Sequence, residues 1–360
     1  MRKLFSVALI FSLIMSSVVG SSAQSAGQGR APASTTGTVK TRATPKAPSR
    51  TAADELVAIL PASNLIAVVD VGRAFNELLP KIAGLTVGGV DKLAKSIQDF
   101  TQKTGIDPSR IQTAVIGVSM DGPQGTGVVI IQGIDPDPQQ IEAAMKEFGS
   151  EFKTSDYKGK TVYNVASKVK APSAGPLSLK TDEVALAALG RQRVAFGDLK
   201  VVKQVIDIQT GAAKGGVSAA MTGALNETRA SALVRFALNI PETLRAQAVD
   251  QGDLFKSVAA IKLVLGTFDV ASDFSLSLDT IIRTASQNDA AELENSLKGL
   301  VDLVRGIFGG GDPKTNFFTQ LLDQVKIGSK LSEVSLSIAV PRALMDQLSK
   351  KETPAPAEKK

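Results

Sequence analysis

The segment Phe274-Ser275-Leu276-Ser277-Leu278-Asp279 indicates the fold class, because apolar and polar residues alternate along it. Successive side chains of a strand point to opposite faces of a sheet, so one face of this strand should be buried and the other solvated. This pattern is typical of an antiparallel sheet that is covered on one side only. We therefore predict strands over 261–270 and 274–282, and another over 334–338, where Val, Leu and Ile alternate with Ser.

Two amphipathic helices should cover this sheet. The first is predicted over 290–308, where apolar residues recur at helical spacing from Leu293 to Phe308. The second is predicted over 313–325, where Asp312-Pro313 provides a helix start. We expect both helices to pack on the strands at 261–282 and 332–340, because each buried methylene contributes about 0.8 kcal/mol.

Strands and helices also alternate in the first part of the chain. The Gly-, Ala- and Ser-rich stretch 210–223 lies between two parts with a similar order of elements. The sequence therefore predicts an α+β fold, with largely antiparallel sheets covered by amphipathic helices. One interpretation is a pair of related αβ halves, 54–210 and 224–350, and the alternative is a chain without duplication. The further predicted strands lie at 65–71, 111–118, 128–132, 157–163 (a hairpin), 184–189, 193–196 and 232–238.

The composition excludes several kinds of chemistry. The 360 residues include no His, no Cys and no Trp. Without imidazole or thiol, the chain can form no Ser-His-Asp triad, no HExxH zinc site, no thiolate metal site and no disulfide. The net charge of +6 comes from the ends, because residues 54–350 contain 31 basic and 33 acidic residues. A nucleic-acid-binding fold concentrates basic charge on its own surface, so we expect no nucleic-acid partner.

The first 23 residues have the features of a signal peptide. Met1 to Lys3 are followed by sixteen uncharged residues and then by small residues, with Ser21 and Ala23 suited to a cleavage site after Ala23. Sixteen residues are short for a membrane span, which needs about 20. We therefore expect a secreted or periplasmic protein without a transmembrane span after cleavage. An uncleaved anchor is the alternative.

Residues 24–53 are rich in Ala, Thr and Pro and carry basic residues but no acid. Such a segment buries too little apolar surface to fold, so we predict a disordered linker. The alternative is a weak contact with an anionic surface, through the five cations Arg30, Lys40, Arg42, Lys46 and Arg50. The last ten residues, 351–360, are predicted to form a disordered tail.

Three candidate sites have structural interpretations that we favour. The segment 309–315 has the composition of a phosphate loop, but Asp312 and Pro313 interrupt the required spacing. Ser155 and Lys158 match Ser-x-x-Lys, but they lie in a predicted hairpin rather than at a helix start. A set of aspartates that could bind a hard cation precedes helices or turns, which favours capping: Asp107, Asp135, Asp137, Asp289 and Asp312. We therefore assign no catalytic, cofactor-binding or metal-binding residue.

Three short motifs resemble a family of uncharacterised bacterial exported proteins of unknown function. They are Leu60-Pro61-Ala62 before a strand that ends in Asp70, Tyr157-x-Gly159 in a hairpin, and Ala195-Phe196-Gly197-Asp198 before a helix. The resemblance implies export and an α+β fold built from repeated αβ modules. It provides no catalytic residue.

These observations favour a non-catalytic protein that binds a protein or envelope component, or acts as an envelope-associated scaffold. The alternative is a histidine-independent hydrolase that uses carboxylates or a lysine, with Asp70, Asp156 and Lys158 as its first candidates.

Overall fold

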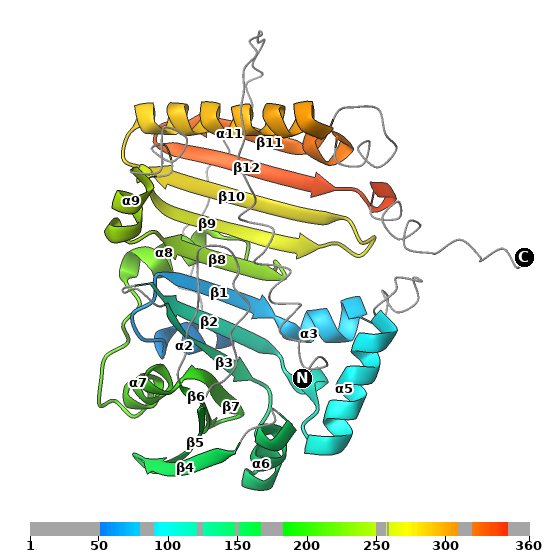
Figure 1. Cartoon of the computed structure of the whole chain (residues 1–360), viewed down its shortest axis with the longest axis vertical. Coiled ribbons are helices and arrows are strands. Elements are labelled where there is room, and N and C mark those ends of the chain that lie inside the picture. Colours follow the sequence, from blue (N-terminus) through cyan, green and yellow to red (C-terminus); the bar gives the residue numbers. More distant parts are fainter. Residues whose placement is uncertain are drawn as a thin grey trace, which may run out of the picture.

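The structure is a computed structural model that describes residues 51–79, 90–120, 125–147, 151–166, 183–249, 257, 259–308 and 319–344. Their strands form one twelve-stranded sheet in the order β11-β12-β10-β9-β8-β1-β2-β3-β7-β6-β5-β4 (Figure 1). All strand pairs are antiparallel, which confirms the predicted fold class. The predicted signal peptide at 1–23, residues 24–50 of the linker, the segment 309–315 and the tail at 351–360 lie outside the described residues.

The strands of the first half are β1 (Leu65–Asp70), β2 (Thr113–Ser119), β3 (Thr126–Gln132), β4 (Phe152–Tyr157), β5 (Lys160–Ala166), β6 (Glu183–Gly190) and β7 (Arg193–Asp198). Those of the second half are β8 (Val234–Asn239), β9 (Ile261–Val270), β10 (Leu276–Thr284), β11 (Val325–Lys330) and β12 (Glu333–Val340). The helices are α2 (Ala52–Ala58), α3 (Val71–Arg73), η1 (Ala74–Leu78), α5 (Val90–Thr104), η2 (Pro108–Arg110), α6 (Pro138–Glu147), α7 (Leu199–Gln209), α8 (Ala219–Glu227), α9 (Glu242–Val249) and α11 (Gln287–Phe308).

The sheet has two differently covered faces. We call one the α7 face, because α2, α7 and α8 pack there on Val68, Val115, Ile130, Ala195 and Ala237. The other is the α11 face, on which Ala290 and Leu293 of α11 pack against Ile282 and Val334. Alternate residues of each strand supply the two cores, as the pleat requires.

Strands β1 and β8 join the two parts of the chain. Asp70 ends β1, and Val68 of β1 lies opposite Arg235 of β8. The sheet is therefore continuous across the candidate boundary at 210–223, and α8 spans residue 224. Helix α2 begins within the last residues assigned to the linker, because Thr51 and Asp54 form a capping box and Ala53 is buried. The division into related halves stays a prediction.

The helix predicted at 290–308 is confirmed as α11, which contacts β10, β11 and β12. The second predicted helix lies partly outside the described residues, and its extension to Val325 is wrong. Residues 319–323 are helical, but Val325 begins strand β11, which pairs with β12 around a turn at Leu331. The reason is tertiary: Val325 to Lys330 includes two Lys and one Gly, and becomes a strand by pairing with β12.

The strand predicted at 274–282 begins at Leu276 as β10, because Phe274 lies in the preceding turn with a φ of 68°. Within β10 the one-sided pattern is confirmed. Leu278 lies on the α11 face, while Asp279 is exposed on the α7 face. Ser335 of β12 and Lys326 of β11 are also exposed there. We call this region the open face and define it by Ser277, Asp279, Lys326, Ser335 and Ser337. None of the helices within the described ranges combines the length and apolar character needed to cross a membrane.

Candidate functional site

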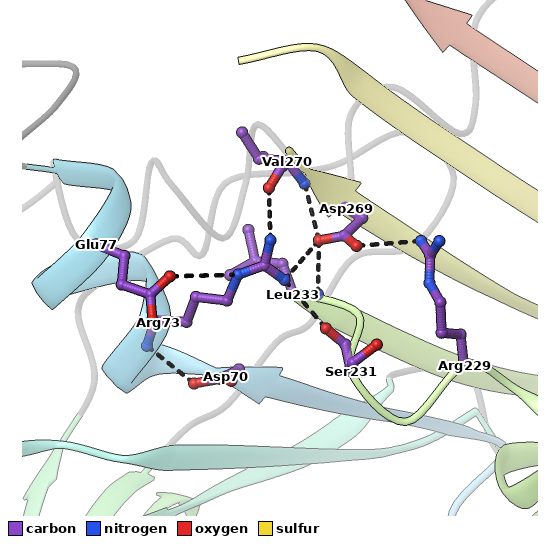
Figure 2. A network of polar contacts seen from close by, with 8 residues as sticks. All are labelled: Asp70, Arg73, Glu77, Arg229, Ser231, Leu233, Asp269 and Val270. Atoms are coloured by element: carbon purple, nitrogen blue, oxygen red, sulfur yellow. Dashed lines mark hydrogen bonds and ion pairs between the residues drawn. The ribbon is translucent and has the colours of Figure 1, made fainter. Parts of the chain in front are cut away.

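A polar cluster lies where β1, β8 and β9 meet (Figure 2). Asp70, at the end of β1, accepts a hydrogen bond from the backbone N–H of Arg73 at 2.9 Å and so begins α3. The Arg73 guanidinium then donates to Asp269 Oδ1 at 2.7 Å, to the Val270 carbonyl at 2.6 Å and to the Ser231 carbonyl at 3.0 Å. Arg73 therefore connects the first part of the chain to three acceptors of the second.

Asp269 is the centre of this cluster. Its carboxylate also accepts from the backbone N–H groups of Leu233 at 3.3 Å and Val270 at 3.0 Å, and it pairs with Arg229 at 3.2 Å. The Asp269 carboxylate is therefore held by two arginines and two backbone N–H groups, in a cluster that connects the two parts of the chain.

A second polar cluster contains the predicted Ser-x-x-Lys pair. Ser155 lies in strand β4 opposite Val162, and Lys158 lies in the following turn with a φ of 51°. The helical geometry that would bring Ser155 and Lys158 together for catalysis is therefore not formed. Instead, Lys158 Nζ lies 2.6 Å from Asp207 Oδ1, and Tyr157 donates its hydroxyl to the same carboxylate at 3.0 Å.

The electrostatics of this cluster oppose base catalysis by Lys158. The hydrogen bond with Asp207 raises the pKa of Lys158, and the same bond lowers the pKa of Asp207. The hydrogen bond to Asp207 also raises the pKa of Tyr157. A lysine that activates a serine needs a lowered pKa, so the shift has the wrong direction for that chemistry.

Two of the predicted aspartate caps are confirmed. Asp107 accepts from the backbone N–H of Ser109 at 2.9 Å and begins η2. Asp137 and Gln140 form a reciprocal capping box at the start of α6, with bonds of 2.8 and 3.0 Å. These carboxylates therefore satisfy helix termini.

Asp289 is not the cap that the sequence predicted. Ser286 is the cap of α11, because its hydroxyl accepts from the backbone N–H of Asp289 at 3.2 Å. The remaining aspartates are Asp135, which is exposed, and Asp312, which lies outside the described residues. Within the described ranges, no group of three acidic residues is placed to hold a metal ion.

The hydrolase candidates are not brought together. Asp70 caps α3, and Asp156 accepts from the backbone N–H of Gly159 at 3.3 Å in the edge hairpin. Strands β1 and β4 are six positions apart in the sheet, or about 29 Å at the usual strand spacing. Asp70 and Asp156 therefore cannot act on one substrate atom.

The sequence motifs at 60–62 and 195–198 meet at a hollow of about 280 Å³. Its lining includes Pro61, Ser63, Gly117, Asp198 and Lys200. Asp198 accepts from the backbone N–H groups of Lys200 at 2.9 Å and Val201 at 3.4 Å. Two N–H groups at the N-terminus of α7 are therefore hydrogen-bonded to this cap. The third motif lies at the other end of α7, where Tyr157 contacts Asp207. No local signal in the sequence predicted these contacts between distant segments.

No protein-family model matches the chain, and no curated protein matches its sequence. Solved structures of TP0453, a Treponema pallidum protein, are similar at 7% identity. Crystal form I has a TM-score of 0.42, with 84% of this chain and 99% of that chain covered. Crystal form III has a TM-score of 0.43, with 82% and 97% covered. The function therefore has to be argued from the residues of this chain.

Proposed function

We propose that the protein is exported and non-catalytic, and that it binds an envelope partner through the open face of its sheet. The observation that carries this proposal is the exposure of Asp279 and Ser335 on strands whose opposite face is buried under α11. Because α11 packs on the opposite face of these strands, the exposed side chains are attached to a rigid part of the sheet. Binding to a rigid surface avoids much of the entropy loss that ordering a loop would require.

The polarity of the open face suits a partner that dissociates and remains soluble. Ser277, Ser335 and Ser337 are small, and Asp279 and Lys326 supply charges of both signs. Interfaces between independently folded proteins are no more apolar than an average protein surface. The open face therefore does not need a large apolar patch to serve as a contact surface.

The pairing of the candidate catalysts supports binding over hydrolysis. Lys158 is ion-paired with Asp207, and Asp70 and Asp156 are engaged at a helix start and a turn. Export rests on the signal-peptide features of residues 1–23.

Photo-cross-linking in intact cells tests the proposal. We would place p-benzoylphenylalanine at Ser337 on the open face and, as a control, at the exposed Asn295 of α11. The expected result is a discrete cross-linked product from the extracytoplasmic fraction with the probe at Ser337 and none with the probe at Asn295. The proposal is rejected if the two positions give the same products, or if the protein remains in the cytoplasm. Hydrolysis of an ester, peptide or glycan that is abolished by Lys158→Ala would favour the hydrolase instead.

A further inference from the structure

Arg235 is a buried cation without a partner in the described part of the chain. It lies in the middle of β8, opposite Val68 on one side and Thr267 on the other. Only 7% of its surface is exposed, and the residues that the structure describes offer its guanidinium no hydrogen bond or ion pair. Two other arginines of this face differ: Arg193 pairs with Glu55, and Arg283 pairs with Glu227 and Glu333.

Thr267, the neighbour of Arg235 on β9, has the same property. Its exposed fraction is 5%, and its hydroxyl makes no hydrogen bond to the described residues. Directly opposed residues of an antiparallel pair point to the same face, so the guanidinium and the hydroxyl project side by side. Two adjacent donors thus lack a partner among the residues that the structure describes.

This arrangement is unfavourable for the protein alone. Burial lowers the pKa of Arg235, although the charge of Asp54 on α2 opposes the shift. An arginine nevertheless keeps its charge at neutral pH, and burial of an unpaired charge opposes folding. A bound group that supplies oxygen acceptors would remove this cost.

Arg235 and Thr267 begin a row of directly opposed residues on neighbouring strands, and this row continues onto the open face. Thr267 lies opposite Asp279 of β10, and Asp279 lies opposite Ser337 of β12. Asp279 is exposed, whereas Arg235 and Thr267 are buried. The order along the row is therefore guanidinium, hydroxyl and carboxylate.

We propose that Arg235 and Thr267 bind the carboxylate of a small zwitterionic ligand whose amine pairs with Asp279. A guanidinium matches a carboxylate with two parallel hydrogen bonds. A phosphate dianion fits less well, because Asp54 and Asp279 are both near the site and would repel it. This ligand site shares Asp279 with the open face, but its test uses small solutes and does not involve the partner.

Calorimetric titration of the full chain with sodium 4-aminobutyrate tests the proposal. Sodium acetate, sodium phosphate and sodium chloride at equal ionic strength serve as comparison solutes. We expect 4-aminobutyrate to bind more tightly than acetate, and phosphate to bind no better than chloride. Arg235→Met should weaken binding of 4-aminobutyrate about tenfold or more, because a hydrogen bond to a charged group is lost. Asp279→Asn should remove the preference for 4-aminobutyrate over acetate.

Thermal unfolding without ligand provides the structural control. Arg235→Met should leave the melting temperature unchanged or raise it, because it removes an unpaired charge and keeps an apolar stem. Arg283→Met should lower it, because Arg283 pairs with Glu227 and Glu333 on the same face. The proposal is overturned if 4-aminobutyrate binds wild type no better than chloride does, or if Arg235→Met binds it normally. It is also overturned if Arg235→Met destabilises the protein as Arg283→Met does, or if Asp279→Asn leaves the preference intact.

Discussion

Replacement of Arg73 by methionine should destabilise the junction between the two parts of the sheet. The substitution keeps most of the apolar stem and removes the three bonds to Asp269, Val270 and Ser231. A hydrogen bond that involves a charged group contributes about 1.5–3 kcal/mol, and the charged guanidinium donates all three bonds. The Arg73 and Asp269 side chains are 22% and 17% exposed, so water replaces these bonds only in part. We expect Arg73→Met to lower the free energy of unfolding by about 3 kcal/mol.

Arg229→Met is the matched control, because it removes an arginine from the same carboxylate. Arg229 makes a single contact with Asp269 at 3.2 Å, and its side chain is 48% exposed. Exposed pairs of this kind contribute less than about 1 kcal/mol. Urea unfolding followed by circular dichroism at neutral pH and low salt measures both variants. Equal losses in the two variants, or a loss below about 1 kcal/mol in Arg73→Met, would refute the inference that Arg73 holds this junction.

Three further predictions concern packing, backbone and charge. Leu293→Ala in α11 should lower the free energy of unfolding by about 2–5 kcal/mol, because Leu293 is buried. Ile307→Ala should have little effect, because this side chain is 59% exposed. Similar losses for the two variants in urea unfolding would contradict the packing of Leu293 against the sheet. Gly133→Ala should reduce soluble yield, because a Cβ there would lie 2.3 Å from a backbone oxygen at a φ of +117°, whereas Gly223→Ala in α8 meets nothing within 4 Å and should raise stability by up to about 1 kcal/mol. The pKa of Asp207 is lowered in the folded protein, so the unfolded chain binds this proton more tightly than the folded chain does, and the free energy of unfolding falls below about pH 4. Asp207→Asn should make this decrease smaller. An unchanged dependence of the free energy of unfolding on pH would contradict the ion pair.

Local patterns predicted most elements correctly, because they depend on residues close in sequence. The alternation at 274–279 indicated the one-sided strand β10, although this strand begins only at Leu276, and the apolar stripe at 290–308 indicated α11. The capping box of Asp137 and Gln140 was also visible as a spacing. Strand β11 was missed because its residues resemble the end of a helix until β12 pairs with them.

The candidate sites were predicted less completely, because their partners are distant in the chain. The hairpin that contains Lys158 was expected, but its partner Asp207 lies on α7 and has no local relation to it. Arg73 and Asp269 are 196 residues apart, so no spacing rule connects them. Asp289 was expected to cap α11, whereas Ser286 does so, because both residues are able caps and only the helix start at Gln287 distinguishes them.

The sequence by itself determined the kinds of elements, the absence of imidazole and thiol chemistry, and the near-neutral charge of the fold, since these follow from residue types and short periodicities. Only the tertiary structure decided that β1 pairs with β8 in a single sheet and that Arg235 is buried beside Thr267, with no partner among the described residues. The physical reason is that strand order and burial depend on which distant segments pack together. Those long-range contacts leave no periodic signal in either segment alone.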